Sequence, residues 1–73
     1  MTEAEKIAAL IRYRLEQADE ALAAARLNFT NGLQRSAVNR AYYAMFYGVL
    51  ALLVARRSET SRHSSAISQF DRL

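Results

Sequence analysis

The sequence predicts an all-α protein, an antiparallel helical bundle with two long helices and a third, shorter helix, in one domain that covers residues 1–73. Three observations support this prediction. The 73 residues include no proline and only two glycines, so little interrupts a helix. Apolar residues recur every three or four positions over long stretches, which is the period of a helix with one buried side. A short polar link joins the two longest stretches, and short links make consecutive helices antiparallel neighbours.

The first helix is expected from about residue 3 to residue 29. Thr2 and Glu5 form the pattern T-x-x-E, in which the two residues cap each other's backbone N–H groups at a helix start. The helix should end at the sequence TNG, because Gly32 can adopt the left-handed conformation that terminates helices. The apolar positions between these ends follow one stripe: Ile7, Leu10, Ile11, Leu15, Ala18, Leu22, Ala25 and Phe29.

The second helix is expected from about Gln34 to Arg56, and it is apolar on nearly every side. Small residues form one stripe, along which a partner helix can approach closely: Ala37, Ala41, Ala44, Gly48, Ala51 and Ala55. A helix with so little polar surface is either central in a bundle or spans a membrane. In a bundle, four of its larger side chains should be buried against the first and third helices: Met45, Val49, Leu52 and Leu53.

A third helix is expected after a polar loop of sequence SETS, residues 58–61. Three of these four residues are serine or threonine, which are favoured as helix N-caps. The segment RHSSAISQFDRL then places Ala66, Ile67, Phe70 and Leu73 at helical spacing. Because the pattern stops at an apolar residue without a C-terminal cap, we expect these residues to form an incomplete domain, truncated after the third helix.

The apolar run within the second helix is short for a membrane span. It extends from Ala41 to Ala55, fifteen residues, whereas a spanning helix needs about 20. The run also contains tyrosines and a glycine, and Arg40 would lie close to the hydrocarbon. We therefore expect no membrane association, although the paired arginines after the run would suit a cytoplasmic flank.

Composition limits the chemistry that the chain can perform. The chain has no cysteine, so it has neither a disulfide framework nor a thiolate metal site, and this fits a reducing cytoplasm. Its single histidine, His63, cannot build a zinc site without carboxylate ligands. The acidic, polar start MTEAEK is unlike a signal peptide. We expect a cytoplasmic protein without a metal or a cofactor.

Charge is unevenly distributed along the chain. Residues 1–20 carry five acidic and three basic residues, whereas residues 21–73 carry seven arginines and two acidic residues. The formal net charge is +3. An arginine-rich half is compatible with contact to phosphate groups or RNA, and the alternative is an ordinary solvated surface.

Four polar or aromatic residues in the second helix form a candidate ligand-binding group: Asn39, Arg40, Tyr43 and Tyr47. Spacings of three, four, seven and eight residues place them on one side of a helix. Three roles are open. The group could fix the register of packed helices through a buried polar network, hold a structural contact between arginine and a tyrosine ring, or bind the base and phosphate of a nucleotide or RNA.

The segment AVNRAYYAMFYGVLALL, residues 37–53, resembles the signature of the HEPN family, the higher eukaryotes and prokaryotes nucleotide-binding domain. It is most similar to the small stand-alone bacterial and archaeal group, and the similarity extends from about Ala18 to Phe70. The resemblance implies an antiparallel helical bundle that often forms dimers and often pairs with a minimal nucleotidyltransferase in toxin–antitoxin operons. Several branches of the family are metal-independent RNases with an R-x4-6-H motif that is assembled across the dimer.

Arg57 and His63 match the spacing of this RNase motif, with five residues between them. In the family, however, the motif belongs to a later helix, whereas here the pair lies between the second and third predicted helices. The stand-alone group often carries a histidine at the position of His63, at the start of the third helix. We therefore interpret the spacing as coincidental and expect His63 to cap a helix or to form a hydrogen bond. Arg57 and His63 remain weak catalytic candidates.

The sequence leads to three hypotheses about function. The first is a HEPN-type helical module associated with a toxin–antitoxin system, which binds nucleotide, RNA or a nucleotidyltransferase partner. The second is a metal-independent RNase, and the third is a purely structural dimerisation module. In each case we expect a homodimer or higher oligomer that buries the second helix, because large apolar patches are rare on the surface of a monomer.

Overall fold

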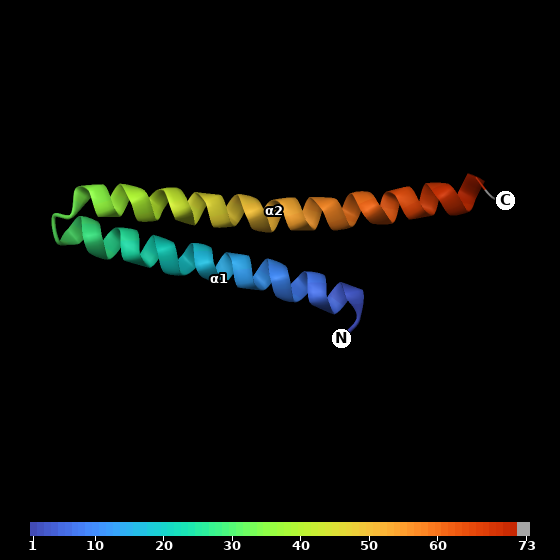
Figure 1. Cartoon of the computed structure of the whole chain (residues 1–73), viewed down its shortest axis with the longest axis horizontal. Helices are drawn as coiled ribbons and strands as arrows, with labels where there is room; N and C mark the ends of the chain where they lie inside the picture. Colours follow the sequence, from blue (N-terminus) through green and yellow to red (C-terminus); the bar gives the residue numbers. More distant parts are fainter. Residues whose placement is uncertain (72–73) are drawn as a thin grey trace.

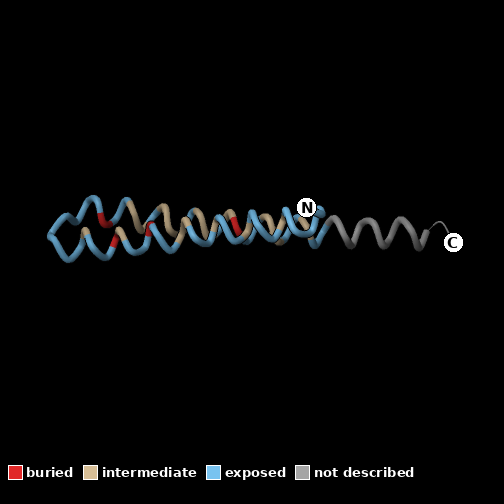
Figure 2. Tube along the Cα trace, turned by 90° about the horizontal axis from the view of Figure 1, so that it is seen from below, coloured by how far each residue is buried: buried red, intermediate tan, exposed pale blue. Residues whose placement is uncertain are grey.

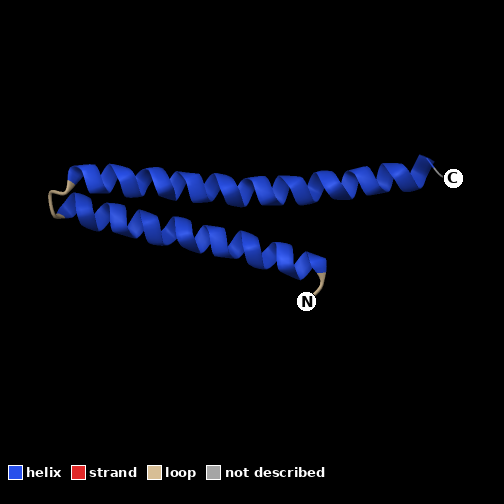
Figure 3. Cartoon of the chain, in the orientation of Figure 1, coloured by secondary structure: helices blue, strands red, loops and turns tan. Residues whose placement is uncertain are grey.

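The protein is an antiparallel hairpin of two long α-helices (Figure 1). The computed structural model describes the backbone of residues 1–71 and the side chains of residues 1–60. Helix α1 spans Glu3–Thr30 and helix α2 spans Gln34–Asp71. The hairpin is long and thin, with extents of 63, 22 and 9 Å. The described backbone contains no β-strand (Figure 3), so the all-α part of the prediction is confirmed.

Helix α1 begins with the capping box that the sequence predicts. The Thr2 hydroxyl accepts a hydrogen bond from the Glu5 backbone N–H at 3.1 Å, and the Thr2 backbone N–H donates to Glu5 Oε1 at 3.2 Å. These two bonds satisfy backbone N–H groups at the start of the helix, which have no acceptor within the helix itself. The carboxylates of Glu3 and Glu5 also lie at the positive end of the helix dipole.

The turn between the helices depends on a left-handed glycine. Gly32 has φ = +77°, and its N–H donates to the carbonyl of Phe29 at 3.0 Å. The Leu33 N–H donates to the carbonyl of Asn28 at 2.8 Å. This pair of bonds is the Schellman arrangement, which satisfies carbonyl groups at the end of a helix. The predicted termination at Gly32 is confirmed, and the short turn directs α2 back along α1.

Two glycine substitutions should change stability in opposite directions. Gly32→Ala should lower the free energy of unfolding by about 1–2 kcal/mol, because an L-residue is strained in the left-handed region. Gly48→Ala should raise it by roughly 0.5–1 kcal/mol, because Gly48 is helical and a Cβ there would meet nothing within 4 Å. Urea unfolding followed by circular dichroism, at one protein concentration, measures both changes. Effects of the same sign would contradict this account of the turn.

The prediction of three helices was wrong, because α2 continues without a break through residues 58–61 to Asp71. The segment SETS contains neither glycine nor proline, so nothing in it forces the backbone out of a helix. Extending a helix adds one hydrogen bond per residue, whereas starting a new helix requires an unfavourable first turn. Serine and threonine are good caps, but inside a helix each costs at most about 0.7 kcal/mol relative to alanine. Extension is therefore favoured, and the expected bundle is a two-helix hairpin.

The few buried residues lie in the part of the hairpin where the two helices are paired (Figure 2). Among the residues with described side chains, the buried ones are all alanines: Ala21 and Ala25 of α1, and Ala37 and Ala51 of α2. The other members of the predicted small stripe are half-buried: Ala41, Ala44, Gly48 and Ala55. The stripe therefore faces α1, which is the partner helix that its small residues allow to approach. Alanine lets two helices approach closely but removes little apolar surface from water, so this contact contributes only modest stability.

The larger apolar side chains of α2 are exposed, contrary to the prediction. The four that the sequence places in the core have exposed fractions between 51% and 68%: Met45, Val49, Leu52 and Leu53. That prediction required a third helix to cover them, and the described backbone forms only α1 and α2. The contact with α1 uses the small stripe, which lies on a different side of α2.

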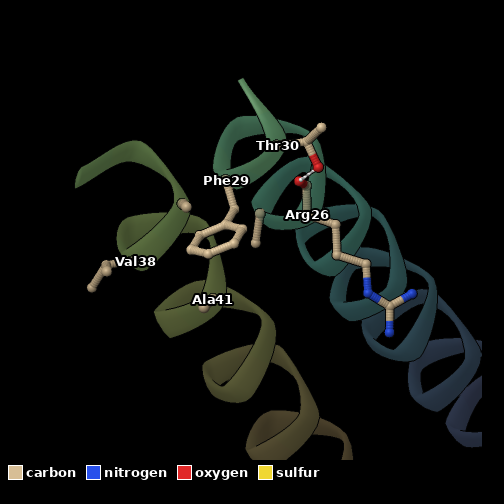
Figure 4. A pocket seen from close by; sticks show the side chains of 7 residues that line it. Arg26, Phe29, Thr30, Val38 and Ala41 are labelled. Carbon is tan, nitrogen blue, oxygen red and sulfur yellow. Dashed lines mark hydrogen bonds between the residues drawn. The ribbon is translucent and has the colours of Figure 1, made fainter. Parts of the chain in front are cut away.

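Both helices contribute to one exposed apolar face. Near the turn, an open and mostly apolar groove of about 510 Å³ lies between the helices (Figure 4). Its lining consists of Ala25, Arg26, Phe29 and Thr30 of α1 and Ala37, Val38 and Ala41 of α2. Phe29 and Val38 line this groove from the two helices. Residues three, four or seven positions apart lie on the same side of a helix, so apolar residues at these spacings from Phe29 and from Val38 extend the same side of the hairpin. We define the apolar face as seven residues that are 40–71% exposed: Leu15, Leu22, Phe29, Val38, Met45, Val49 and Leu52.

Helix α2 is long and apolar enough to cross a membrane, judged by length and composition alone. The segment Gln34–Thr60 has 27 residues, and its most apolar stretch has a mean hydropathy of 1.3. Only 11% of that stretch is buried inside the hairpin. The central helix of a bundle passes the same test, so the predicted absence of membrane association stays a prediction. The low burial means that α1 alone does not cover the apolar surface of α2.

Candidate functional site

Positive charge gathers near the turn of the hairpin. Residues 21–58 contain five arginines and neither aspartate nor glutamate, so no acidic residue within this stretch offsets their charge. Three of the arginines lie within a few helical turns of Gly32: Arg26, Arg35 and Arg40. Arginine recognises phosphate and carboxylate groups through paired N–H donors. The turn end of the hairpin is therefore the region where an anionic ligand would meet the most favourable charge.

Arg40 is held by two neighbours on its own helix. Its Nη2 donates a hydrogen bond to Asn39 Oδ1 at 3.2 Å. Its Cζ lies 4.8 Å from the centre of the Tyr43 ring, which makes a cation–π contact. The Arg40 side chain is half-buried, whereas Asn39 is exposed. Because a guanidinium carries five N–H donors, Arg40 retains donors for a ligand while Tyr43 orients its plane.

Tyr47 completes the predicted group. Its ring centre lies 6.0 Å from that of Tyr43, with 36° between the two planes. Tyr47 and Arg40 also line a cleft of about 180 Å³ against α1, which Gln17 and Glu20 line from the α1 side. We name this cleft the α1 cleft. The structure thus brings the four predicted residues together along one side of α2, and their role in binding stays a prediction.

A second cleft lies beside the turn and shares Arg40 with the α1 cleft. This tip cleft has a volume of about 320 Å³ and is lined by Asn28, Arg35, Ser36, Asn39 and Arg40. Every one of these side chains can donate a hydrogen bond, and the two arginines are permanently charged. None of the five is acidic. The lining therefore suits an anion such as a phosphate group, and it offers a cation no carboxylate.

Three aromatic rings follow the tip cleft along α2. The rings of Tyr42 and Phe46 are nearly parallel, with 3° between their planes and 6.5 Å between their centres. Tyr43 lies edge-on to both, at 89° to Tyr42 and 88° to Phe46. Tyr42 is 59% exposed and Phe46 is 44% exposed. The three rings therefore form one aromatic cluster on α2, in which Tyr42 and Phe46 are exposed.

The sequence does not identify several of these residues as part of a site. Three of them lie on α1: Gln17, Glu20 and Asn28. Their spacing along the sequence is no different from that of the other polar residues of this helix, so nothing in the pattern marks them. Pairing the two helices antiparallel around the turn would have placed them near the Arg40 group. Tyr42 and Phe46 are conspicuous in the sequence, but an aromatic residue in an apolar helix is more often part of a core.

The described residues do not show Arg57 and His63, the two weak catalytic candidates, together in a site. Arg57 is exposed on α2, and the side chain of His63 lies outside the described residues. Residue 63 is in the interior of α2, so the predicted capping role for His63 was wrong because no helix starts there. Across residues with described side chains, no three histidine, cysteine, aspartate or glutamate residues lie close enough to hold a metal ion.

Comparison with known proteins finds relatives over almost the whole chain. The family model described as "HEPN domain" matches residues 11–73. The UPF0332 protein of Thermotoga maritima is 46% identical over 72 residues, which cover 99% of this chain and 52% of that protein. A protein of Methanocaldococcus jannaschii named "Putative toxin" is 44% identical over 66 residues, 90% of this chain and 46% of that protein. The chain therefore spans about half the length of these curated relatives. No solved structure matches it.

Proposed function

This chain belongs to the HEPN domain family, and we propose that it is a helical module of a toxin–antitoxin system that binds RNA or a nucleotide. The resemblance of its NRAYYAMFY segment to that family is confirmed. The relative named "Putative toxin" supports an association with toxins. The proposal concerns the module formed by residues 1–73, since the relatives are about twice as long.

The orientation of Arg40 is the observation that supports binding most directly. Its contacts with Asn39 at 3.2 Å and with Tyr43 at 4.8 Å hold the guanidinium where it lines both the tip cleft and the α1 cleft. A ligand with an anionic part and a polar ring part could contact both clefts through this one side chain. Tyrosine rings, arginines and amides in one cluster are the groups with which proteins bind nucleotides and single-stranded RNA.

Arg40→Ala should weaken RNA binding by about tenfold or more, because it removes the charged donor that both clefts share. Fluorescence anisotropy with a labelled RNA of about 12 nucleotides, at about 50 mM salt, measures the dissociation constant. Arg12→Ala is the matched control, because Arg12 is an exposed arginine in the acidic first half of α1. Equal losses in the two variants, or no binding by the unmodified protein, would contradict the proposal.

The same RNA tests the RNase alternative. Incubation of the pure protein with the labelled strand in the presence of EDTA separates binding from metal-independent cleavage. We expect binding without cleavage, because the tip cleft, which would hold a phosphate group, is lined by hydrogen-bond donors and by neither a carboxylate nor an imidazole. Cleavage that repeats in independent preparations and that His63→Ala abolishes would replace the binding proposal with the RNase alternative.

We propose a second copy of the chain as the partner at the apolar face, whose seven side chains are 40–71% exposed. Exposed apolar patches of this extent mark interaction sites on water-soluble proteins. Family membership supports a nucleotidyltransferase as a further partner. The cytoplasm, without membrane association, is the location that we propose, since the chain has no cysteine and α2 carries arginines in and beside its apolar stretch.

A further inference from the structure

We propose that two copies of the chain pair through the apolar face about a two-fold axis that passes between their Leu22 side chains. The turn of each hairpin then lies over the open end of the other, the end opposite its turn. This inference rests on the proposed second copy at the apolar face and goes beyond it by fixing the orientation and the register of the pair. It also assigns interface roles to two exposed charged residues of α1, Asp19 and Arg26.

The apolar face contains three layers that are evenly spaced along the hairpin. Phe29 and Val38 line the same groove near the turn, so they lie at one level (Figure 4). Each further layer lies seven residues away along both helices, which is a rise of about 10.5 Å. The layers pair one residue of α1 with one of α2: Phe29 with Val38, Leu22 with Met45, and Leu15 with Leu52. A two-fold axis through the middle layer therefore maps the two outer layers onto each other.

The two outer layers are complementary in shape. Ala25 and Ala37 line the groove of about 510 Å³ near the turn and are 6% and 5% exposed, so they form its floor. At the other end of the apolar face, Leu15 and Leu52 are 49% and 68% exposed, so both project from the surface. In the proposed pair, each groove receives the two leucines of the other copy. Apolar surface on both sides is then removed from water.

Charge on α1 favours the antiparallel direction. Asp19 and Arg26 follow Leu15 and Leu22 by four positions, so both charges lie on the same flank of the apolar face. Their midpoint along α1 is within one residue of Leu22. The axis therefore brings Arg26 of each copy beside the partner's Asp19, which gives two contacts of opposite charge. A parallel pair in register would instead place like charges together, which is unfavourable.

A second two-fold arrangement would place both turns at the same end and pack α1 of each copy on α2 of the other. Asp19 and Arg26 would then lie over the apolar side of α2, where residues 41–55 include no charged residue. A charge that apolar groups cover without a partner loses its contact with water, which is unfavourable. The proposed pair avoids this cost, because α1 packs on α1 and α2 packs on α2.

Charge reversal tests the two contacts, with the dissociation constant of the pair measured by sedimentation equilibrium at about 50 mM salt. Asp19→Arg and Arg26→Asp should each raise this constant about tenfold, because each substitution makes both contacts repulsive. An equimolar mixture of the two variants should regain the original constant within about threefold, since a mixed pair has opposite charges at both contacts. Glu16→Arg is the control and should leave the constant unchanged, because Glu16 is exposed about 120° around α1 from Leu22.

Disulfide cross-linking tests the register, and the chain has no cysteine that would interfere. Under mild oxidation, Leu15→Cys and Phe29→Cys chains should link to each other in a mixture, because the axis carries residue 29 of one copy to residue 15 of the other. Neither variant should link to itself, since identical positions at these residues are then about 21 Å apart along the pair.

Self-linking of Phe29→Cys without mixed links would show that the turns lie together and would overturn the inference. Equal effects of Asp19→Arg and Glu16→Arg, or no recovery in the mixture of charge variants, would overturn it as well. In each of these cases a two-chain mass of the unmodified protein keeps the second copy as the partner at the apolar face. A single-chain mass of the unmodified protein would instead remove that partner, and the inference with it.

Discussion

Ala21→Leu should lower the free energy of unfolding by about 1–3 kcal/mol, because a larger side chain at the helix contact forces the two helices apart. Ala21 is 4% exposed, and it is buried on the side of α1 that packs against the small stripe of α2. The described part of the hairpin has no larger buried side chain that could hold the helices together when this contact opens. Urea unfolding followed by circular dichroism measures the change.

Ala23→Leu is the matched control for this prediction. Ala23 lies two positions away on the same helix and is exposed, so the same substitution adds a side chain to the surface. Surface substitutions usually change stability by no more than about 0.5 kcal/mol. If leucine at residue 23 destabilises the protein as much as leucine at residue 21, the helices are not held together by their alanines.

Leu52→Glu should shift the protein from an assembly toward the monomer. Burying a leucine contributes roughly 1.5–3 kcal/mol, and a symmetric dimer loses this contribution in both copies. The new carboxylate adds the cost of removing a charge from water. We therefore expect the dissociation constant of the assembly to rise about a hundredfold or more. Sedimentation equilibrium over a range of protein concentrations measures it.

Leu27→Glu separates this effect from a general effect of surface charge. Leu27 is 63% exposed and Leu52 is 68% exposed, so both substitutions replace a similarly accessible leucine. Leu27 is five positions from Leu22, which places it about 140° around α1 from the apolar face. The substitution Leu27→Glu should therefore change the dissociation constant of the assembly by no more than about threefold. Equal effects of the two substitutions would show that the apolar face is not the interface.

Features that depend on one helical turn could be predicted from the sequence. The capping box needs only Thr2 and Glu5, and both of its hydrogen bonds are present. The end of α1 needs only a residue that tolerates positive φ, and Gly32 supplies it. The common side of Asn39, Arg40, Tyr43 and Tyr47 follows from helical spacing alone. In each case the chemistry that decides the structure lies within a few residues along the chain.

The break between helices two and three could not be predicted in the same way. Serine and threonine at residues 58–61 are favoured as caps, yet they are also tolerated inside a helix. The choice depends on the cost of starting a new helix and on what that helix would pack against. Neither quantity is encoded in those four residues, and α2 continues through them.

Burial in α2 was predicted only in part, because a helix that is apolar on every side carries no directional signal. The small stripe indicated close approach of a partner, and the structure places it against α1. The large side chains indicated a core, but their burial depends on a covering partner that the pattern does not identify. The α1 cleft escaped prediction for a related reason, since Gln17 and Glu20 meet Arg40 and Tyr47 only through the pairing of the two helices.

The molar mass of the chain in solution tests the central claim most directly, namely that the apolar face is an interface between copies. Light scattering on the 73-residue protein at micromolar concentration should give at least twice the chain mass of 8.2 kDa. The same sample should be helical by circular dichroism. A helical particle of 8.2 kDa would contradict the claim, because the seven residues of the apolar face would then remain in water.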